Sequence, residues 1–487
     1  MNTQRACNRV VHLFVLSVLS VLSVLLARPL RAQRTNADAA TLVRAMATTL
    51  QRTANLPGLS IAVSQNGRIV FAEGFGFADL ASQRLVTPRT RFRTASVGKV
   101  ITATALGTLV QAHRLDLDAP IQTYVPSFPT KAWPITAREL AGHLAGMPHY
   151  SDADKIEPRF YPSVQDALTV FAHEALREAP NTRYRYSTHG ITLLSAAIEG
   201  AARQPFLEYL QQAVLAPLGM RSTAPDIRAH PAPELATYYE LRAGALQPVT
   251  HPEDPSYKWA GGGLTSTPSD LVRLAEGYFN GFLDAATVSS MWASQRVASG
   301  GETGVGLVWR LGHDATGRRT VEHAGSMEGA RAVLVIFPDE HVVIALMTNR
   351  EWSSTIEETA HMLALPFLRP NARRPALQGT YDLQVEATAV SGAKSTEPGV
   401  MTLSNRRGAL ALTAESSSRA LRLFALDSGG VYALVRPDGI YHTVLRMVGD
   451  TLTGRSIGYG SPQLTQPDAN TPFLRFSGVR RTRGPRR

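Results

Sequence analysis

The sequence predicts an α+β fold: an antiparallel sheet flanked by helices with an inserted helical region, and a C-terminal all-β domain after it. Three observations support this. Strand-like apolar runs lie at both ends of the first 368 residues, helical patterns fill the space between them, and only short alternating runs follow residue 376. Strands at both ends with helices inserted between them are typical of an antiparallel α+β design. The runs of the first part are 59–63, 69–72, 319–323, 330–337 and 342–348.

The elements of this first part, 38–368, follow from periodicity and turn signals. A helix is predicted over 38–53, where apolar residues recur at helical spacing. The dipeptide Asn66-Gly67 between the first two strand-like runs is a strong hairpin signal. Further helices are predicted over 97–111, 135–143, 163–178, 191–202, 205–216 and 354–367.

A proline- and arginine-rich linker over 369–376 separates the two parts. The runs beyond it, with turns such as 427–430 and 437–439 between them, predict an all-β barrel or sandwich over 377–479, and 480–487 form a basic tail. Strands are predicted over 380–385, 400–403, 410–412, 421–425, 431–435 and 441–447.

The first 32 residues have the pattern of a secretory signal peptide. Arg5 and Arg9 precede an apolar run over 10–27, and Leu30-Arg31-Ala32 after it is a plausible cleavage end. We therefore expect a periplasmic or secreted protein, with an uncleaved membrane anchor as the alternative reading. Cys7, the only cysteine, precedes the apolar run, so a lipid-anchored precursor is rejected and the mature chain has no disulfide.

The net charge of +11 comes almost wholly from arginine. No basic helix with interleaved aromatic residues accompanies it, so we expect no nucleic-acid partner. The basic tail is either a solubilising end or a contact with anionic polymers or lipid of the cell envelope.

Ser96-Val97-Gly98-Lys99 is the most informative motif of the chain, because it stands where a helical pattern begins. Serine needs a base beside it to act as a nucleophile, and residues three apart share one face of a helix. Lys99 is therefore expected beside Ser96. A second such spacing, Ser391 to Lys394, lies in a loop-like stretch and is read as chance. The G-x-S-x-G pattern over 454–458 is read as a turn, because no helix is predicted after it.

Two further segments join this motif in the order and approximate spacing of a known superfamily: Tyr186-Ser187-Thr188 and His323-Ala324-Gly325. Together the three resemble the serine beta-lactamases and penicillin-binding proteins. The resemblance is closest to the class C-like branch, which also holds D-aminopeptidases, family VIII esterases and the mitochondrial serine beta-lactamase-like protein. Segments 115–120, 140–148 and 261–266 resemble further motifs of that branch, so the likeness covers about residues 40–368.

The resemblance implies roles for individual residues. Ser96 matches the acylated nucleophile, Lys99 its base partner, and Tyr186 the tyrosine that shuttles the proton with the lysine. Tyr184 is a rival by spacing, but it aligns with an apolar core position. The motif that ends at Gly325 matches the strand bordering the site, and the backbone N–H groups of Ser96 and Ser326 would form the oxyanion hole.

Two residues depart from the beta-lactamase pattern. Thr188 replaces an asparagine that contacts the substrate amide, and His323 replaces a permanently charged lysine. Histidine titrates near neutrality, so recognition of a substrate carboxylate is expected to be weaker and dependent on pH. Both changes argue against efficient hydrolysis of penicillins.

We therefore expect an exported serine hydrolase that forms an acyl-enzyme and cleaves peptide or amide bonds of small substrates. A carboxylesterase or weak beta-lactamase of the same fold is the alternative among enzymes. A non-catalytic binding or scaffold protein is the alternative of another class, although all three reactive positions are kept. The histidines show no H-E-x-x-H motif or close acid pairing, so neither a metal nor a cofactor is expected.

Overall fold

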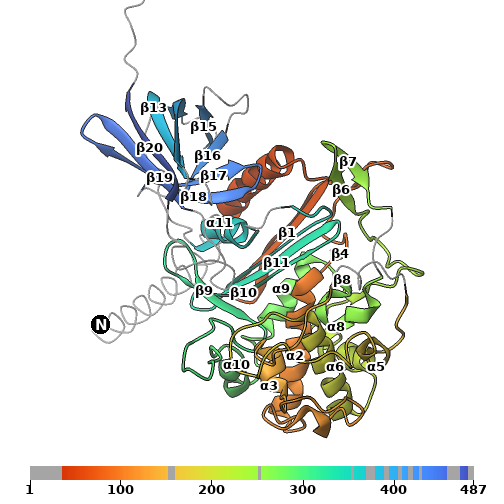
Figure 1. Ribbon diagram of the computed structural model, residues 1–487. Helices are drawn as coiled ribbons and strands as arrows, with labels where there is room; N and C mark the ends of the chain where they lie inside the picture. Colours follow the sequence, from red (N-terminus) through yellow and green to blue (C-terminus); the bar gives the residue numbers. More distant parts are fainter. Residues whose placement is uncertain are drawn as a thin grey trace, which may run out of the picture.

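The computed structural model describes residues 36–151, 159–250, 254–352, 356–368, 379–388, 394–403, 409–414, 421–426, 430–457 and 472–480. Within these ranges a seven-stranded sheet has the order β3-β2-β1-β12-β11-β10-β9 (Figure 1). All its neighbouring strands are antiparallel, and β1 at the start of the chain pairs with β12 near the end of the first part. The strands are β1 (Gly58–Gln65), β2 (Arg68–Asp79), β3 (Arg84–Leu85), β9 (Arg310–His313), β10 (Arg319–Met327), β11 (Ala330–Phe337) and β12 (Val342–Thr348).

The hairpin between β1 and β2 forms where the sequence predicts it. Asn66 and Gly67 both have positive φ, 51° and 77°. A two-residue turn with positive φ at both positions matches the twist of the flanking strands, and Asn-Gly is the dipeptide that adopts it most readily.

Different helices cover the two faces of the sheet. A helix over 36–53 and α11 (Ile356–Leu368) pack on the face that carries Ile61, Val335 and Ile344. The inserted helical region packs on the opposite face, which carries Leu334 and Ala345. This arrangement confirms the predicted α+β class.

The helical region lies below the sheet in Figure 1. It consists of η1 (Ala95–Val97), α2 (Gly98–Gln111), η2 (Ile121–Thr123), α3 (Ala137–Ala141), α5 (Val164–Leu168), α6 (Thr188–Ala202), α7 (Phe206–Leu210), η3 (Gln211–Leu215), η4 (Pro255–Lys258), α8 (Trp259–Gly262), α9 (Pro268–Glu276) and α10 (Ala285–Met291). Short strands accompany it: β4 (Phe92–Arg93), β5 (Ala224–Pro225) and β8 (Leu264–Ser266) form one small sheet, and β6 (Tyr239–Arg242) and β7 (Ala245–Pro248) another.

Two predicted helices are shorter in the structure. The helix expected over 135–143 is α3, which begins after a capping box between Thr136 and Glu139 and ends before His143, a residue with φ of 56°. The helix expected over 163–178 ends at Leu168. Beyond it, the carbonyl groups of Ala172 and Glu174 accept hydrogen bonds from the side chain of Lys131, which is distant in the sequence.

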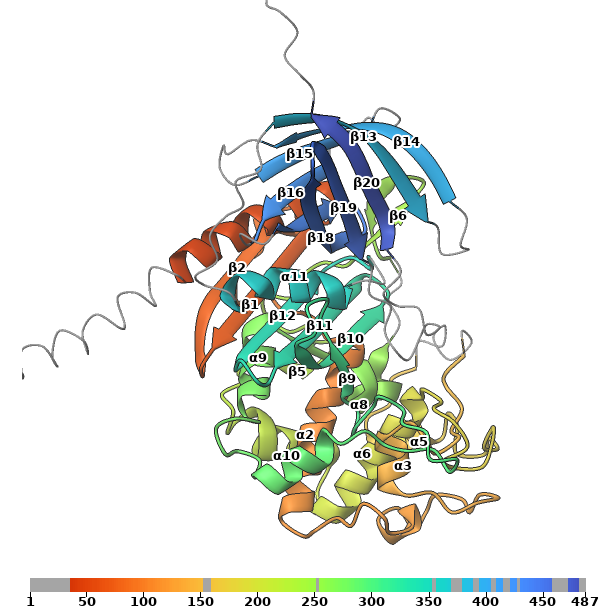
Figure 2. The same ribbon diagram turned by 90° about the vertical axis from the view of Figure 1, so that its left-hand side faces the viewer.

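The C-terminal part is a closed antiparallel barrel (Figure 2). Its strands are β13 (Gly379–Thr388), β14 (Lys394–Leu403), β15 (Ala409–Ala414), β16 (Leu421–Ala425), β17 (Val431–Arg436), β18 (Gly439–Val448), β19 (Thr451–Ile457) and β20 (Pro472–Arg480). Strands β19 and β20 were not predicted from the sequence. The reading of 454–458 as a turn was wrong, because residues 454–457 lie in β19 and the buried Ser456 hydroxyl hydrogen-bonds with that of Thr443 at 2.6 Å.

The barrel rests on α11, which lies between it and the main sheet (Figure 2). Strand β17 shows the arrangement. Tyr432 and Leu434 belong to the core inside the barrel, whereas Ala433 and Val435 join the core around α11. Alternate residues of one strand thus fill two cores, so the barrel and the sheet share a continuous apolar contact across α11.

Several predicted segments lie outside the described residues: the signal peptide over 1–32, the linker over 369–376, Ser391 of the second S-x-x-K spacing, and 481–487 of the basic tail. In the part of the chain that the structure describes, no helix is both long enough and apolar enough to cross a membrane.

Candidate active site

Ser96 lies in η1, directly before the buried helix α2, and η1 contacts both strand β10 of the sheet and α8 of the helical region. One turn later Lys99 is fully buried, and its Nζ donates to Ser96 Oγ at 3.0 Å and to the Gly261 carbonyl at 2.5 Å. The spacing of three residues thus brings the two side chains together as expected. The carbonyl from α8 holds the lysine in place.

The surroundings of Lys99 favour a neutral amine. Burial and, after it, the positive charge of Arg310 lower the pKa of Lys99 well below its ordinary value. An amine without its extra proton can accept the proton of a serine hydroxyl, which an ammonium group cannot do.

Tyr186 approaches Ser96 from the helical region. Its hydroxyl donates to Ser96 Oγ at 2.7 Å, and Lys99 Nζ lies 5.0 Å from the centre of its ring. Burial raises the pKa of Tyr186, against the lowering effect of the hydrogen bond to Ser96. The rival Tyr184 packs its ring edge-on against His143, at 5.7 Å between ring centres.

Strand β10 closes the other side of the site. A Cβ atom at Gly325 would lie 2.7 Å from the backbone nitrogen of Ser96, closer than real Cβ contacts come. Only glycine therefore lets the strand pass so near the serine backbone. Ser326 follows, with its hydroxyl turned to Glu351 at 2.5 Å. The strand position agrees with an oxyanion hole built from the N–H groups of Ser96 and Ser326, and that role stays a prediction.

The expectation that His323 titrates near neutrality is corrected by its environment. The ring is buried, and Nδ1 donates to the Ala324 carbonyl at 2.7 Å. Burial first, and then the positive charge of Arg310, lower the pKa of His323 well below its ordinary value. His323 is therefore neutral at neutral pH and cannot bind a carboxylate as a cation there.

Thr188 is the first residue of α6 and is 1% exposed. Its methyl group packs so closely on Gly261 that a Cβ there would lie 2.4 Å from it. Thr188 thus braces the segment whose carbonyl holds Lys99. A substrate contact by Thr188, which the resemblance implies, stays a prediction.

Arg310 is a charged neighbour of the site that the sequence analysis missed. It lies on the edge strand β9, and its guanidinium donates to Glu357 of α11 at 3.0 Å. Its charge lowers the pKa values of Lys99 and His323. No local pattern marks this arginine among the many others in the sequence.

Among the described residues, no three His, Cys, Asp or Glu side chains come together as a metal site. The expectation that the protein uses no metal or cofactor stays a prediction.

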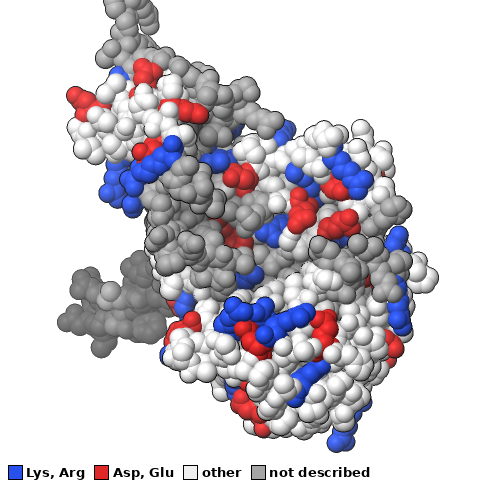
Figure 3. Space-filling view, in the orientation of Figure 1, with Lys and Arg blue, Asp and Glu red and all other residues white. Residues whose placement is uncertain are grey.

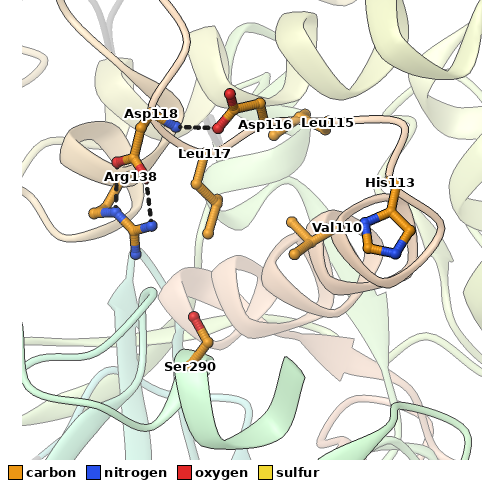
Figure 4. A pocket seen from close by; sticks show the side chains of 8 residues that line it. All are labelled: Val110, His113, Leu115, Asp116, Leu117, Asp118, Arg138 and Ser290. Atoms are coloured by element: carbon orange, nitrogen blue, oxygen red, sulfur yellow. Dashed lines mark hydrogen bonds and ion pairs between the residues drawn. The ribbon is translucent and has the colours of Figure 1, made fainter. Parts of the chain in front are cut away.

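A surface pocket of about 380 Å³ lies at the far end of α2, near Val110 (Figure 4). Val110 is eleven residues from Lys99, about 16 Å along a helix. The cationic group that lines the pocket, Arg138, is neutralised by Asp118 through hydrogen bonds of 2.6 and 2.7 Å. This pocket is therefore separate from the serine site.

Acidic and basic side chains are mixed over the described surface of the face in Figure 3. The positive net charge of the whole chain is thus not gathered into one broad basic field on that face.

The chain belongs to the beta-lactamase family, whose sequence profile matches residues 43–366. The family resemblance and the α+β class expected from the sequence are therefore confirmed. The family is one of serine hydrolases and includes amidases and esterases.

Individual relatives support the same family assignment. The mitochondrial serine beta-lactamase-like protein LACTB of Mus musculus is 26% identical over 431 residues, which cover 65% of this chain and 78% of that protein. The octameric penicillin-binding protein homologue from Pyrococcus abyssi has a TM-score of 0.59 at 19% identity, covering 89% of this chain and 99% of that one. A D-stereospecific amidohydrolase from Streptomyces sp. has a TM-score of 0.54 at 20% identity, covering 64% and 96%.

Proposed function

We propose that this protein is an exported serine hydrolase that cleaves peptide or amide bonds of small substrates through an acyl-enzyme on Ser96. One observation carries the proposal. Ser96 Oγ accepts hydrogen bonds from Lys99 Nζ at 3.0 Å and from the Tyr186 hydroxyl at 2.7 Å. A nucleophile with two proton-transfer groups within hydrogen-bond reach is the arrangement that acyl transfer requires.

In the proposed mechanism, Ser96 Oγ attacks the substrate carbonyl carbon while the neutral Lys99 amine takes the hydroxyl proton. Tyr186 passes a proton to the leaving amine as the carbon–nitrogen bond breaks, and the proton that Lys99 took from Ser96 returns to Tyr186. The N–H groups of Ser96 and Ser326 stabilise the oxyanion. Water, activated by the same two side chains, then hydrolyses the ester bond to Ser96 and releases the acid.

The neutral His323 supports a substrate other than a penicillin. A buried, uncharged imidazole offers no fixed cation to a carboxylate. The similarity in fold to a D-stereospecific amidohydrolase supports amide substrates. Export is proposed from the pattern of residues 1–32.

The purified full-length chain tests the proposal when it is assayed against small peptide amides, activated esters and benzylpenicillin. We expect amide hydrolysis to exceed penicillin hydrolysis and a fluorophosphonate probe to label Ser96. Ser96→Ala should abolish labelling and reduce turnover to the residual level that binding and oxyanion contacts supply.

Other outcomes decide between the alternatives. Turnover of esters alone would make the protein a carboxylesterase, and fast penicillin hydrolysis would make it a beta-lactamase. A folded chain that hydrolyses none of these substrates and takes no label would point to a binding or scaffold protein.

A further inference from the structure

Two histidines from one loop accept backbone hydrogen bonds at the start of α6, beside the tyrosine of the site. His143 Nδ1 accepts from the Ser187 N–H at 3.3 Å, and His149 Nδ1 accepts from the Thr188 N–H at 3.0 Å. Ser187 is the N-cap of α6, and its Oγ accepts from the Gly190 N–H at 2.9 Å. The first N–H groups of a helix have no partner within the helix, so these acceptors fix how the chain enters it.

Tyr186 is the residue directly before this cap. The peptide group between Tyr186 and Ser187 donates to His143, and the next peptide group donates to His149. Both imidazole rings also contact the Tyr186 ring, at 4.6 Å and 5.5 Å between ring centres. The same two histidines therefore hold the backbone and the ring of Tyr186.

The loop that carries the histidines is itself tied to the chain before α6. The carbonyl groups of His143, Leu144 and Gly146 each accept a backbone hydrogen bond of 2.8 Å, from Arg185, Asn181 and Arg177. A loop held in this way can place an imidazole nitrogen reliably, as a group that positions a catalytic side chain must.

We propose that His149 is a positioning residue that sets the Tyr186 hydroxyl on Ser96 through the hydrogen bond to the Thr188 N–H. The inference rests on the proposed function, since it assigns a purpose only if Tyr186 transfers protons. His149 suits a test better than His143, because His143 is buried and His149 is exposed. Nδ1 must be unprotonated to accept the bond, so the proton of the neutral ring is on Nε2.

Two substitutions separate the contribution of the hydrogen-bond acceptor from that of the aromatic ring of His149. His149→Phe keeps an aromatic ring but removes the acceptor, whereas His149→Asn loses the ring but can place an amide oxygen near the Nδ1 position. We expect His149→Phe to lower kcat by about 10- to 100-fold with KM changed little, because small misplacements of a catalytic group cost rates of this order. His149→Asn should recover most of this loss.

A double-mutant cycle and a control complete the experiment. In a Tyr186→Phe background, His149→Phe should have little further effect, because the two changes act through one group. The exposed His173, changed to Phe, should leave kcat unchanged. Midpoints of thermal unfolding, measured for every variant, should stay near that of the parent protein.

The proposal would be overturned if His149→Asn were as slow as His149→Phe, or if the effects of His149→Phe and Tyr186→Phe multiplied in full. A parent enzyme that is active and sensitive to Tyr186→Phe, but indifferent to His149→Phe, would refute this inference alone. A parent chain without hydrolytic activity would refute the proposed function and, with it, this inference.

Discussion

Strand β10 separates two buried clusters of titratable side chains in which histidine behaves in opposite ways. His323 points to the serine site, and its neighbour Glu322 points to α11, because adjacent strand residues face opposite sides of a sheet. On the α11 side, His361 Nε2 lies 2.6 Å from Glu322 Oε2. Both histidines are buried, so burial alone does not explain their difference.

The charges around each histidine determine the direction in which its pKa shifts. Burial lowers the pKa of His323, and the charge of Arg310 lowers it further. Burial also acts to lower the pKa of His361, but the charge and hydrogen bond of Glu322, with the charge of Glu358, outweigh it and raise the pKa to about 9. Cationic surroundings thus keep bases neutral at the site, whereas acidic surroundings keep a cation buried under the barrel.

The largest expected effect is a loss of activity when the proton-transfer groups on the Ser96 side of β10 are changed. Lys99→Ala and Tyr186→Phe should each lower kcat/KM by about 10²- to 10⁴-fold, the usual contribution of a general base. The losses should not multiply in the double variant, because both residues serve one proton transfer. Steady-state kinetics measure these losses.

Tyr184→Phe is the matched control and should keep its rate, since that ring contacts His143 rather than Ser96. An active Tyr186→Phe enzyme beside an inactive Tyr184→Phe enzyme would show that Tyr184, and not Tyr186, transfers the proton.

The next effect concerns stability on the α11 side. A pKa raised from 6.5 to about 9 means that His361 contributes stability fully below pH 6.5 and loses it as pH rises towards 9. Glu358, whose pKa burial raises to about 7, acts in the same direction between pH 4.5 and 7, because the fold favours its protonated form. We expect the free energy of unfolding to fall by about 3 kcal/mol between pH 6.5 and 9 through His361.

Urea denaturation of the parent protein and His361→Gln at pH 6.5 and 9 measures this loss. The substitution should flatten the pH dependence, whereas the exposed His313, changed to Gln, should leave it as in the parent. An equal loss of unfolding free energy between pH 6.5 and 9 in the parent and in His361→Gln would contradict the raised pKa.

The sequence predicted best the contacts that local geometry determines. Ser96 and Lys99 meet because they are three residues apart on a helix, and the hairpin forms at Asn66-Gly67 because both residues tolerate positive φ. Tyr186 is 90 residues from Ser96, so only the family resemblance could indicate it.

Other contacts around the site could not be predicted from the sequence, because only tertiary packing brings their residues together. The pair of Glu322 and His361 joins residues 39 apart, and the charge of Arg310 reaches the site from an edge strand. The pKa of His323 was misjudged for the same reason, since the composition around its motif does not reveal its burial. The helix predicted over 163–178 ends at Leu168, and beyond it the carbonyl groups of Ala172 and Glu174 bind Lys131, a residue far away in the sequence.

The smallest expected effect sharpens the comparison at Arg310, a cation whose charge acts on both clusters. Arg310 is held by Glu357 of α11, yet its charge lowers the pKa of Lys99, after burial as the larger cause. Arg310→Gln should therefore raise the pKa of Lys99 and move the acid limb of the kcat/KM profile to higher pH, by up to about one unit. An uncharged ester substrate keeps binding of a substrate carboxylate out of the measurement. Arg310→Lys retains the charge and should leave the limb near its original position, so coincident profiles for the two variants would show that the charge of Arg310 does not act on Lys99.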